Sequence, residues 1–220
     1  DTSGPGLHKR GYRLDANEAP LKETLAAALV YLARVKDYHT LYDPMCGSGT
    51  ILIEGTMLAH NIAPGLKRKF TAESWKNIPQ EVWQQERTRA QDLIKLDSDF
   101  KAYGSDIDDK SLEIAKLNSK RAGVDSKIEY YNSDIRNFTP KTQKGTVICN
   151  PPYGERMLEV KEAENLYLEM GKRFDKRPGW AYYIISPADN FEVVFGRRAD
   201  KRRKLYNGMI KCQVFMYYKQ

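Results

Sequence analysis

The sequence predicts an α/β domain built on a mostly parallel sheet. Short apolar runs alternate with helical patterns through most of the 220 residues, and strands joined by helices form parallel sheets with right-handed crossovers. Near the C-terminus, Asn207-Gly208 lies between two strand-like runs, which is a strong signal for a tight hairpin. We therefore expect one C-terminal strand to enter the sheet antiparallel.

Five runs rich in β-branched and aromatic residues are the predicted strands. They cover residues 40–45, 101–106, 128–134, 146–150 and 180–186. Helical patterns cover residues 20–33, 49–60, 109–123 and 162–174. Pro20 suits the first turn of its helix, because a missing N–H does no harm there. In the helix at 109–123, Asp109 can cap the start and Gly123 marks the end.

Residues 61–100 do not follow this alternation. They contain Pro64-Gly65, two tryptophans and a further helical pattern, and we interpret them as a helical insertion between the first helix after a strand and the second strand. The first 20 residues are rich in Gly, Pro and charge. The chain begins at Asp1 with neither an initiator Met nor a leader pattern, so we expect it to be part of a longer protein.

Composition excludes several classes of protein. With 41% hydrophobic and 30% charged residues, the chain can bury a full core and is no disordered tail. No apolar run approaches the ~18 residues that span a membrane. Cys46, Cys149 and Cys212 have no CxxC spacing, which argues against a disulfide framework and a zinc site. We expect reduced, buried thiols in a cytoplasmic protein.

The charge balance leaves two interpretations open. Lys and Arg exceed Asp and Glu by seven, with clusters at residues 8–13, 67–69 and 197–204. Such clusters are solvated surface in most proteins. They also bind phosphates, because basic side chains release counterions from a nucleic acid and steer its approach.

A glycine-rich turn follows the first predicted strand. Residues 43–50 are DPMCGSGT, in which Gly47 and Gly49 let the backbone turn sharply and approach a ligand without an intervening Cβ. The N–H groups of the next helix then face any carboxylate or phosphate placed there. The pattern is neither G-x-x-x-x-G-K-[ST] nor G-x-G-x-x-G, so a triphosphate loop is disfavoured, whereas dinucleotide binding stays open on this loop alone.

Acidic residues end the next two predicted strands. Asp106 can accept both hydroxyls of a ribose, and removal of the ~40-residue insertion would restore the spacing of about 20 that dinucleotide-binding folds show. A helix N-cap, which Asp108 or Asp109 would supply, is the alternative. Asp134 can accept a hydrogen bond from an adenine amino group. In open α/β sheets, ligands bind at this C-terminal edge.

The fourth strand ends in Asn-Pro-Pro-Tyr on the same edge. Pro151 and Pro152 fix φ and donate nothing to the ladder, which would leave the Asn150 side chain and the Pro151 carbonyl as free acceptors facing the cleft. Two such acceptors suit the two hydrogens of a planar amine and would orient its lone pair toward an electrophile. Tyr153 offers a flat surface for a flipped base, which is worth ~1–3 kcal/mol.

In this order, DPMCGSGT, GSDID (104–108), NSD (132–134) and NPPYGER (150–156) resemble the motifs of class I S-adenosylmethionine-dependent methyltransferases that methylate amines. The resemblance implies a Rossmann-like, mostly parallel seven-stranded sheet with an antiparallel C-terminal hairpin strand and a helical insertion. DTSGPGLHKRGYR, APLKETLAA and the extended NPPYGER are similar to bacterial large-subunit rRNA guanine-N2-methyltransferases, whose catalytic domain follows a THUMP RNA-binding domain. Residues 1–20 would then lead in from a missing THUMP-like part, and 21–220 would form the catalytic domain, with its insertion at about 61–100.

The resemblance also implies a role for each matching position. The cofactor would be S-adenosylmethionine, with S-adenosylhomocysteine as the product, and no metal. Its contacts would be Lys22, Asp43, Pro44, Cys46, Gly47, Ser48, Gly49, Thr50, Asp106, Ile107, Ser133, Asp134, Ile135 and Asn150. The target amine would be positioned by Asn150, Pro151, Pro152 and Tyr153. RNA, from 23S rRNA or a pre-ribosomal particle, would be bound by Lys9, Arg10, Arg13 and Arg156.

The expected reaction is direct methyl transfer to an exocyclic guanine amine, with positioning as the main contribution of the protein. Methylation of adenine N6 in DNA or RNA is the nearest alternative, because NPPY motifs serve both amines. Further alternatives are guanine-N2 methylation of tRNA, methylation of a protein glutamine, which the basic clusters disfavour, and a non-catalytic RNA-binding module. The sequence leaves the modified nucleotide and the oligomeric state open.

Overall fold

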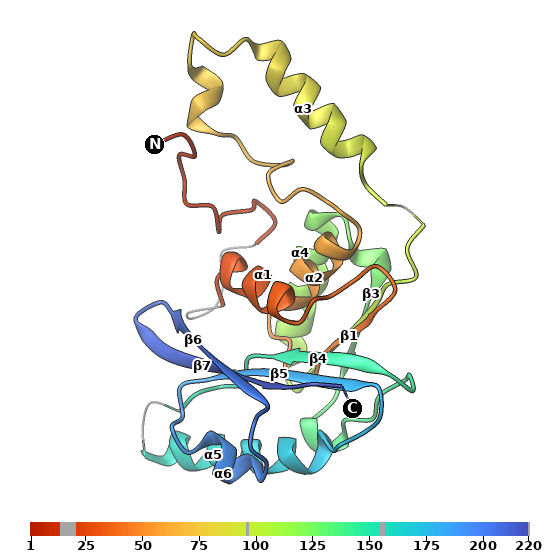
Figure 1. Cartoon of the computed structure of the whole chain (residues 1–220), viewed down its shortest axis with the longest axis vertical. Helices are drawn as coiled ribbons and strands as arrows, with labels where there is room; N and C mark the ends of the chain where they lie inside the picture. Colours follow the sequence, from red (N-terminus) through yellow and green to blue (C-terminus); the bar gives the residue numbers. More distant parts are fainter. Residues whose placement is uncertain (14–20, 96, 155–156, 220) are drawn as a thin grey trace.

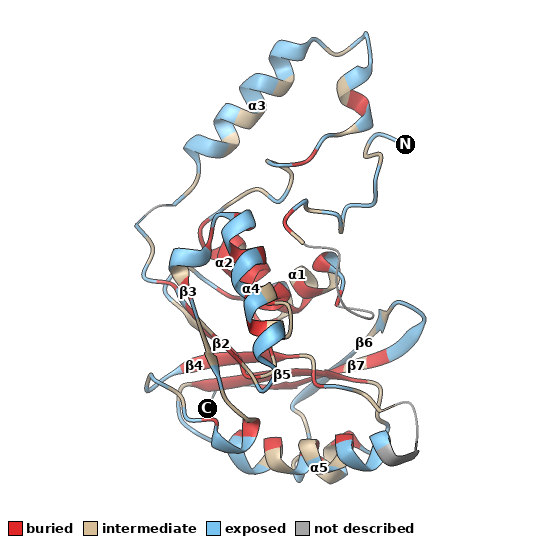
Figure 2. Cartoon of the chain, turned by 180° about the vertical axis from the view of Figure 1, so that it is seen from behind, coloured by how far each residue is buried: buried red, intermediate tan, exposed pale blue. Residues whose placement is uncertain are grey.

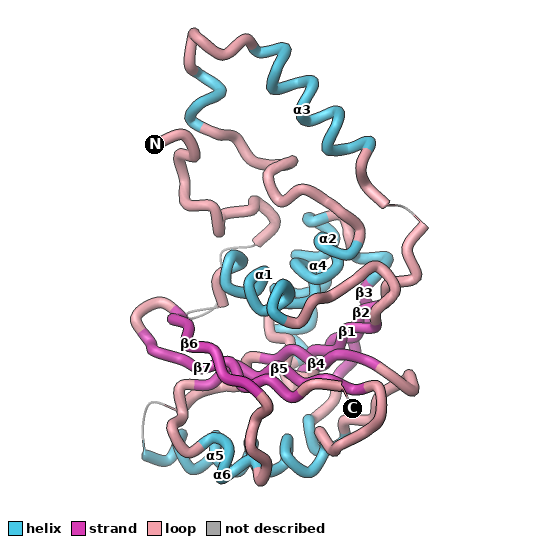
Figure 3. Tube along the Cα trace, viewed as in Figure 1, coloured by secondary structure: helices cyan, strands magenta, loops and turns pink. Residues whose placement is uncertain are grey.

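The computed structural model describes residues 1–13, 21–95, 97–154 and 157–219. Its centre is a sheet of seven strands in the order β3-β2-β1-β4-β5-β7-β6 (Figures 1 and 3). All neighbouring strands pair parallel except β7, which is antiparallel to both β5 and β6. The strands are β1 (Thr40–Asp43), β2 (Lys101–Asp106), β3 (Ile128–Asn132), β4 (Gly145–Cys149), β5 (Trp180–Ser186), β6 (Lys201–Asn207) and β7 (Ile210–Tyr217).

Helices cover both faces of the sheet (Figure 1). A separate cluster of buried apolar side chains fills the space on each side. The first side holds α1 (Glu23–Leu32), α2 (Thr50–Ala59) and α4 (Asp109–Ala122), and the second holds α5 (Met157–Arg173) and α6 (Phe191–Phe195). Side chains alternate between the clusters along each strand, since Leu41 joins the first and its neighbour Tyr42 the second. All residues of β4 and β5 are buried, as expected for central strands covered on both faces.

The strand order reverses between β1 and β4, which places a topological switch point there. Crevices form at such points outside the carboxyl ends of the strands. The loops after β1, β2, β3 and β4, which carry the four sequence motifs, therefore meet at one edge of the sheet. This is the predicted fold class, with its mostly parallel seven-stranded sheet and antiparallel C-terminal strand.

Two predicted elements are shorter in the structure. Helix α1 begins at Glu23 with Lys22 as its N-cap, and Pro20, which was predicted to lie in the first turn, lies outside the described residues. Strand β3 ends at Asn132, so Asp134 follows the strand and does not end it.

Three further details differ from the sequence-based expectations. Helix α5 begins at Met157, five residues before the predicted start. Asp108, not Asp109, caps α4, because its carboxylate accepts the backbone N–H groups of Lys110 and Ser111. The C-terminal hairpin turns one residue later than Asn207-Gly208 suggested, since Asn207 still pairs with Ile210 and the two turn residues are Gly208 and Met209.

The predicted insertion is an arm that stands away from the sheet (Figures 1 and 2). It contains the short 3-10 helix Thr71–Ser74 and helix α3 (Gln80–Asp92). No residue of α3 is buried. Buried Arg68 ties the base of the arm to the N-terminal segment by donating to the carbonyls of Ser3, Pro5 and Gly6. Within the described part of the chain, no helix is long and apolar enough to cross a membrane. The three cysteines are free and buried, as predicted.

Candidate functional site

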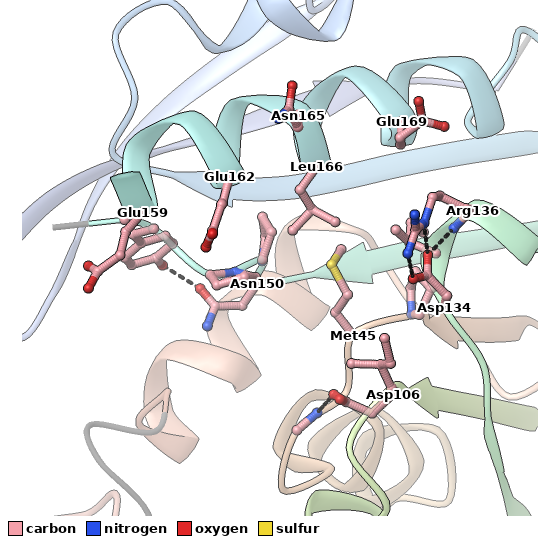
Figure 4. Close-up of a pocket in the computed structure, with 18 of the residues that line it drawn as sticks. Met45, Asp106, Asp134, Arg136, Asn150, Glu159, Glu162, Asn165, Leu166 and Glu169 are labelled. Atoms are coloured by element: carbon pink, nitrogen blue, oxygen red, sulfur yellow. Dashed lines mark hydrogen bonds and ion pairs between the residues drawn. The ribbon is translucent and has the colours of Figure 1, made fainter. Parts of the chain in front are cut away.

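A cavity of about 1020 Å³ opens at the C-terminal edge of the sheet, beside the switch point (Figure 4). Loops after four parallel strands contribute to its wall, together with one face of α5 and the tip of the β6–β7 hairpin. Among the predicted site residues, those that line it are Lys22, Pro44, Gly47, Asp106, Ile107, Ser133, Asp134, Ile135, Asn150, Pro151, Pro152 and Tyr153.

The two loop glycines have different structural roles. Both have positive φ, +50° at Gly47 and +79° at Gly49. A Cβ on Gly47 would meet nothing within 4 Å, so this position faces open space in the cavity. A Cβ on Gly49, the N-cap of α2, would lie 2.5 Å from the Tyr130 hydroxyl and 3.1 Å from the Ala115 Cβ. Gly47 thus leaves room for a ligand, whereas Gly49 lets α2 pack against α4 and β3.

Five predicted cofactor contacts, among them Gly49, lie behind the loop and not on the cavity wall. Asp43 is buried and accepts the Met45 N–H at 3.3 Å, and Cys46 is buried. The Ser48 carbonyl accepts the Asn118 amide, and the buried Thr50 hydroxyl accepts a bond from Arg13. In this structure these residues shape the loop, and direct contact with a ligand stays a prediction for them.

The carboxyl group of Asp43 has a raised pKa. Burial raises the pKa of its carboxyl well above the ordinary value of 3.8, and the nearby negative charge of Asp106 adds to the effect. The folded state therefore binds a proton more tightly here than the unfolded state does. This contribution to stability is full below the unfolded pKa and is lost as the pH rises through the folded pKa.

We expect Asp43→Asn to flatten this part of the pH dependence, because an amide keeps the acceptor for Met45 and carries no charge to bury. Above the folded pKa the variant should be more stable than the wild type by about 1–3 kcal/mol, the usual cost of burying a polar group that lacks its hydrogen bonds. Denaturant unfolding of both proteins without cofactor, from pH 5 to 9, measures the difference. Parallel stability curves over the whole range would contradict the raised pKa.

Asp106 connects two parts of the wall. One carboxylate oxygen accepts the Gly47 N–H at 2.8 Å and the other accepts the Asp108 N–H at 3.1 Å. A carboxylate accepts about four hydrogen bonds, so Asp106 can still receive ligand hydroxyl groups while it holds the loop. The exposed apolar side chain of Ile107 follows it on the same wall.

Asp134 forms a fork with Arg136. Its two oxygens accept the Arg136 Nε and terminal nitrogen at 2.9 and 2.5 Å, and the Arg136 backbone N–H adds a bond of 2.7 Å. These bonds lower the pKa of Asp134 to about 2, so the carboxylate stays ionised. An adenine amino group would have to share Asp134 with Arg136, a partner that the sequence alone did not predict.

The Asn-Pro-Pro-Tyr turn places Asn150 at the end of β4, on the cavity wall (Figure 4). Its amide oxygen is not the free acceptor that the sequence suggested, because the Tyr153 hydroxyl donates to it. Since an amide oxygen has two lone pairs, one remains for a ligand. The Pro151 carbonyl has no partner among the described residues. Burial of the Tyr153 ring raises the pKa of its phenol, which keeps the hydroxyl protonated as a donor.

Helix α5 and the β6–β7 hairpin supply two walls of the cavity that were not predicted from the sequence. The further lining residues are Met45, Arg136, Gly154, Glu159, Glu162, Asn165, Leu166, Glu169, Asn207, Gly208 and Ile210. Glu162 and Leu166 extend from α5 toward the strand ends (Figure 4). Residues 159, 162, 166 and 169 recur at helical spacing, so one face of α5 could have been inferred. Its approach to the motif loops depends on tertiary packing.

The predicted RNA contacts at the N-terminus are largely engaged within the domain. Arg10 pairs with the buried Glu54 at 3.3 Å, and Arg13 lies 3.6 Å from Glu23 and donates to the Leu21 carbonyl. Only Lys9 of the three is exposed. RNA binding by these residues stays a prediction, and Arg156 lies outside the described residues.

A family model and several relatives match this chain. Residues 10–215 match the family model described as "RMKL-like, methyltransferase domain". The chain is 43% identical over 218 residues to "Putative RNA methyltransferase YpsC" of Bacillus subtilis. The matched region is 99% of this chain and 57% of that protein. It is also 41% identical over 221 residues to ribosomal RNA large subunit methyltransferase K/L of Shewanella baltica. That match covers 98% of this chain and 31% of the relative. The chain therefore spans about half the length, or less, of these relatives.

Two solved structures share the fold along the whole chain. One is described as a predicted N6-adenine-specific DNA methylase from Listeria monocytogenes, with 42% identity, a TM-score of 0.93 and coverage of 100% of this chain and 57% of that one. The other is SMU.472, described as a putative methyltransferase complexed with SAH, with 39% identity, a TM-score of 0.94 and coverage of 100% and 58%.

Proposed function

This chain belongs to the RMKL-like methyltransferase domain family, and we propose that it methylates the exocyclic N2 amine of a guanine in large-subunit rRNA. S-adenosylmethionine is the cofactor, as the family and the SAH-bound relative support. The observation that carries the proposal is that the Asn150 and Pro151 acceptors share one cavity with Gly47, Asp106 and the loop after β3. A methyl donor and an amine can therefore meet in it.

The cavity suits this cofactor. When bound, S-adenosylmethionine supplies an electrophilic methyl group on a sulfonium, with a neutral thioether as the leaving group. Gly47 faces open space where the methionine part would lie, Asp106 keeps acceptor capacity for ribose hydroxyls, and Ile107 offers an apolar face to adenine. The acidic lining of the cavity also favours a positively charged ligand.

The acceptors at the end of β4 act on the amine. The free lone pair of the Asn150 oxygen and the Pro151 carbonyl can each take one amine hydrogen, which orients the nitrogen lone pair toward the cofactor side. The Tyr153 hydroxyl holds the Asn150 amide in place for this role. The main catalytic contribution of these residues is then the placement of two reactants at a fixed distance and angle.

Glu162 favours guanine over adenine as the target. Its side chain extends from α5 toward the Asn150 end of β4, and no hydrogen bond or ion pair occupies its carboxylate within the described residues (Figure 4). Beside its exocyclic amine, guanine presents an N1–H donor, whereas adenine presents an N1 acceptor. A carboxylate accepts from guanine N1–H and repels the lone pair of adenine N1.

We expect Glu162→Gln to lower kcat/KM for guanine methylation by about 10–100-fold, because a charge-assisted hydrogen bond becomes a neutral one or points a donor at N1–H. Glu169→Gln is the matched control, since the Glu169 carboxylate already accepts a bond from Lys172. Kinetics with saturating S-adenosylmethionine and unmodified 23S rRNA measure the ratio. Equal kcat/KM values for the two variants would contradict a role for Glu162.

Incorporation of a tritiated methyl group into 23S rRNA from cells lacking the enzyme, followed by digestion to nucleosides, tests the reaction itself. The proposal requires label in N2-methylguanosine. Label in N6-methyladenosine would favour the alternative that the Listeria relative's description suggests. If tRNA is offered beside 23S rRNA and only the tRNA is labelled, the substrate is tRNA. Absence of S-adenosylmethionine binding would favour a non-catalytic module. We further propose a cytoplasmic enzyme whose catalytic domain, residues 21–220, follows a THUMP-like part.

A further inference from the structure

The tip of the β6–β7 hairpin projects beyond the rest of the sheet. β7 pairs with β5 only from Gln213 to Tyr217, whereas its pairing with β6 continues to Asn207 and Ile210. The last residues of the hairpin are thus a two-stranded ribbon that extends past β5 (Figure 1). One part of this tip, Asn207, Gly208 and Ile210, lines the cavity.

The remaining part of the tip presents a mixture of apolar and basic side chains to solvent. Met209 is 98% exposed and Tyr206 is 55% exposed. Tyr206 and Lys211 are directly opposite in the register, so both lie on one face of the ribbon, and Lys204 lies on that face two residues before Tyr206. The Lys204 ammonium is 5.3 Å from the centre of the Tyr206 ring. We call Lys204, Tyr206, Met209 and Lys211 the hairpin stripe.

The cations of the stripe are uncompensated. Neither Lys204 nor Lys211 forms an ion pair with any described residue, and the neighbouring edge-strand residues Lys201 and Arg203 form none either. Lysines on an edge strand prevent sheets from pairing with one another, which would account for the charges on β6. Protection of an edge strand does not account for the exposed side chains of Tyr206 and Met209, or for Lys211, which lies on β7.

The cavity itself cannot hold a phosphate backbone well. Five carboxylates line it, Asp106, Asp134, Glu159, Glu162 and Glu169, against the cations of Lys22 and Arg136. A nucleic acid whose target base enters this cavity needs cations outside the rim for its phosphates. The hairpin stripe lies at that rim, and its tyrosine and methionine offer surfaces on which a base can stack.

We infer that the hairpin stripe binds the single-stranded RNA segment next to the target nucleotide. Lys204 and Lys211 neutralise its phosphates, and Tyr206 and Met209 stack against a base adjacent to the one in the cavity. This inference rests on the proposed function, because it requires an RNA target, and it assigns the surface that holds that target. The RNA strand then bends over the tip of the hairpin between the cavity and the hairpin stripe.

Two double variants of the whole 220-residue chain test it. Lys204→Ala with Lys211→Ala removes the charges, and Tyr206→Ala with Met209→Ser removes the stacking surface. The matched control is Lys116→Ala with Lys120→Ala, two exposed lysines on α4 that do not line the cavity. All four side chains of the stripe are exposed, so we expect thermal unfolding and S-adenosylmethionine affinity to stay as in the wild type.

Filter binding to unmodified 23S rRNA transcript between 50 and 200 mM KCl gives the affinity and its salt dependence. The charge variant should bind more weakly, with a slope of log K against log[salt] reduced by roughly 1.4, which corresponds to two single-strand phosphate contacts. The stacking variant should lose about 5–150-fold in affinity with an unchanged slope. In methyl transfer, both variants should raise KM for RNA and keep kcat within about twofold.

Other outcomes have distinct meanings. If both stripe variants bind RNA as the α4 control does while the wild type still methylates it, the hairpin inference is wrong and the proposed function stands. If the wild type neither binds nor methylates the transcript, both fail. If the wild type self-associates in sedimentation and Met209→Ser abolishes the association, the tip is an interface between copies and the inference is wrong.

Discussion

Asn150→Ala is expected to lower the rate constant for methyl transfer by about 10²–10³-fold, the cost of losing one preorganised hydrogen-bonding group at a reacting centre. The substitution removes the amide oxygen at the end of β4 and leaves the Tyr153 hydroxyl without its acceptor. The amine then keeps only the Pro151 carbonyl and rotates freely about it, so its lone pair is seldom aligned with the methyl group. Single-turnover kinetics with prebound RNA isolate this step.

Two controls separate loss of chemistry from loss of structure. Asn150 is only partly buried, so we expect a nearly unchanged melting temperature and a smaller change in S-adenosylmethionine affinity than in rate. Tyr153→Phe keeps the ring and removes the bond to Asn150, and a decrease of a few-fold to about tenfold is expected, because one neutral hydrogen bond is worth ~1 kcal/mol. Wild-type activity in the Asn150→Ala protein would refute the assigned mechanism.

The second large effect is expected at the glycine loop, where Gly49→Ala should lower the free energy of unfolding by about 2–5 kcal/mol. A φ of +79° costs an L-residue about 1–2 kcal/mol, and the new Cβ would stand 2.5 Å from the Tyr130 hydroxyl. Tyr130 cannot easily withdraw, because its hydroxyl bonds to Ser119 at 2.8 Å. Denaturant unfolding without cofactor measures the loss.

Gly47→Ala is the matched comparison, since it makes the same chemical change two residues earlier. Its φ of +50° carries a similar backbone cost, but the new Cβ meets open space. We expect a loss of only about 1–2 kcal/mol in stability. The affinity for S-adenosylmethionine should fall by about tenfold or more, because the methyl group would occupy the cavity. Calorimetric titration checks this, and equal effects of the two variants on stability would contradict the distinct roles of the glycines.

Much of the fold could be predicted because its signals are local. Buried strands between amphipathic helices give apolar runs of the right length, and each of the five predicted strands is present in the sheet. The Gly123 stop of α4 was also correct, since the left-handed C-cap at φ +79° suits glycine. The hairpin was predicted to within one residue, because strand register fixes the turn and a sequence signal only locates it approximately.

The candidate site was predictable where its residues end strands. Asp106 ends β2, and Gly47, Asp134 and Asn150 follow three other parallel strands. The carboxyl ends of such strands meet at one edge, so the convergence of these residues follows from topology alone. Residues whose role depends on burial were harder to place. Asp43 and Thr50 belong to the same motif as Gly47 and yet pack behind the loop, because packing decides which way a side chain in a tight turn faces.

The fold class, the order of the four motifs and the chemistry that they can support follow from the sequence, because each of these depends on neighbours along the chain. The bond from Tyr153 to Asn150, the ion pair of Arg136 with Asp134, and the cavity walls formed by α5 and the hairpin depend on the packing of the folded chain. Contacts across the cavity join residues far apart in sequence, and their geometry is set by how helices and strands pack, which no local pattern encodes.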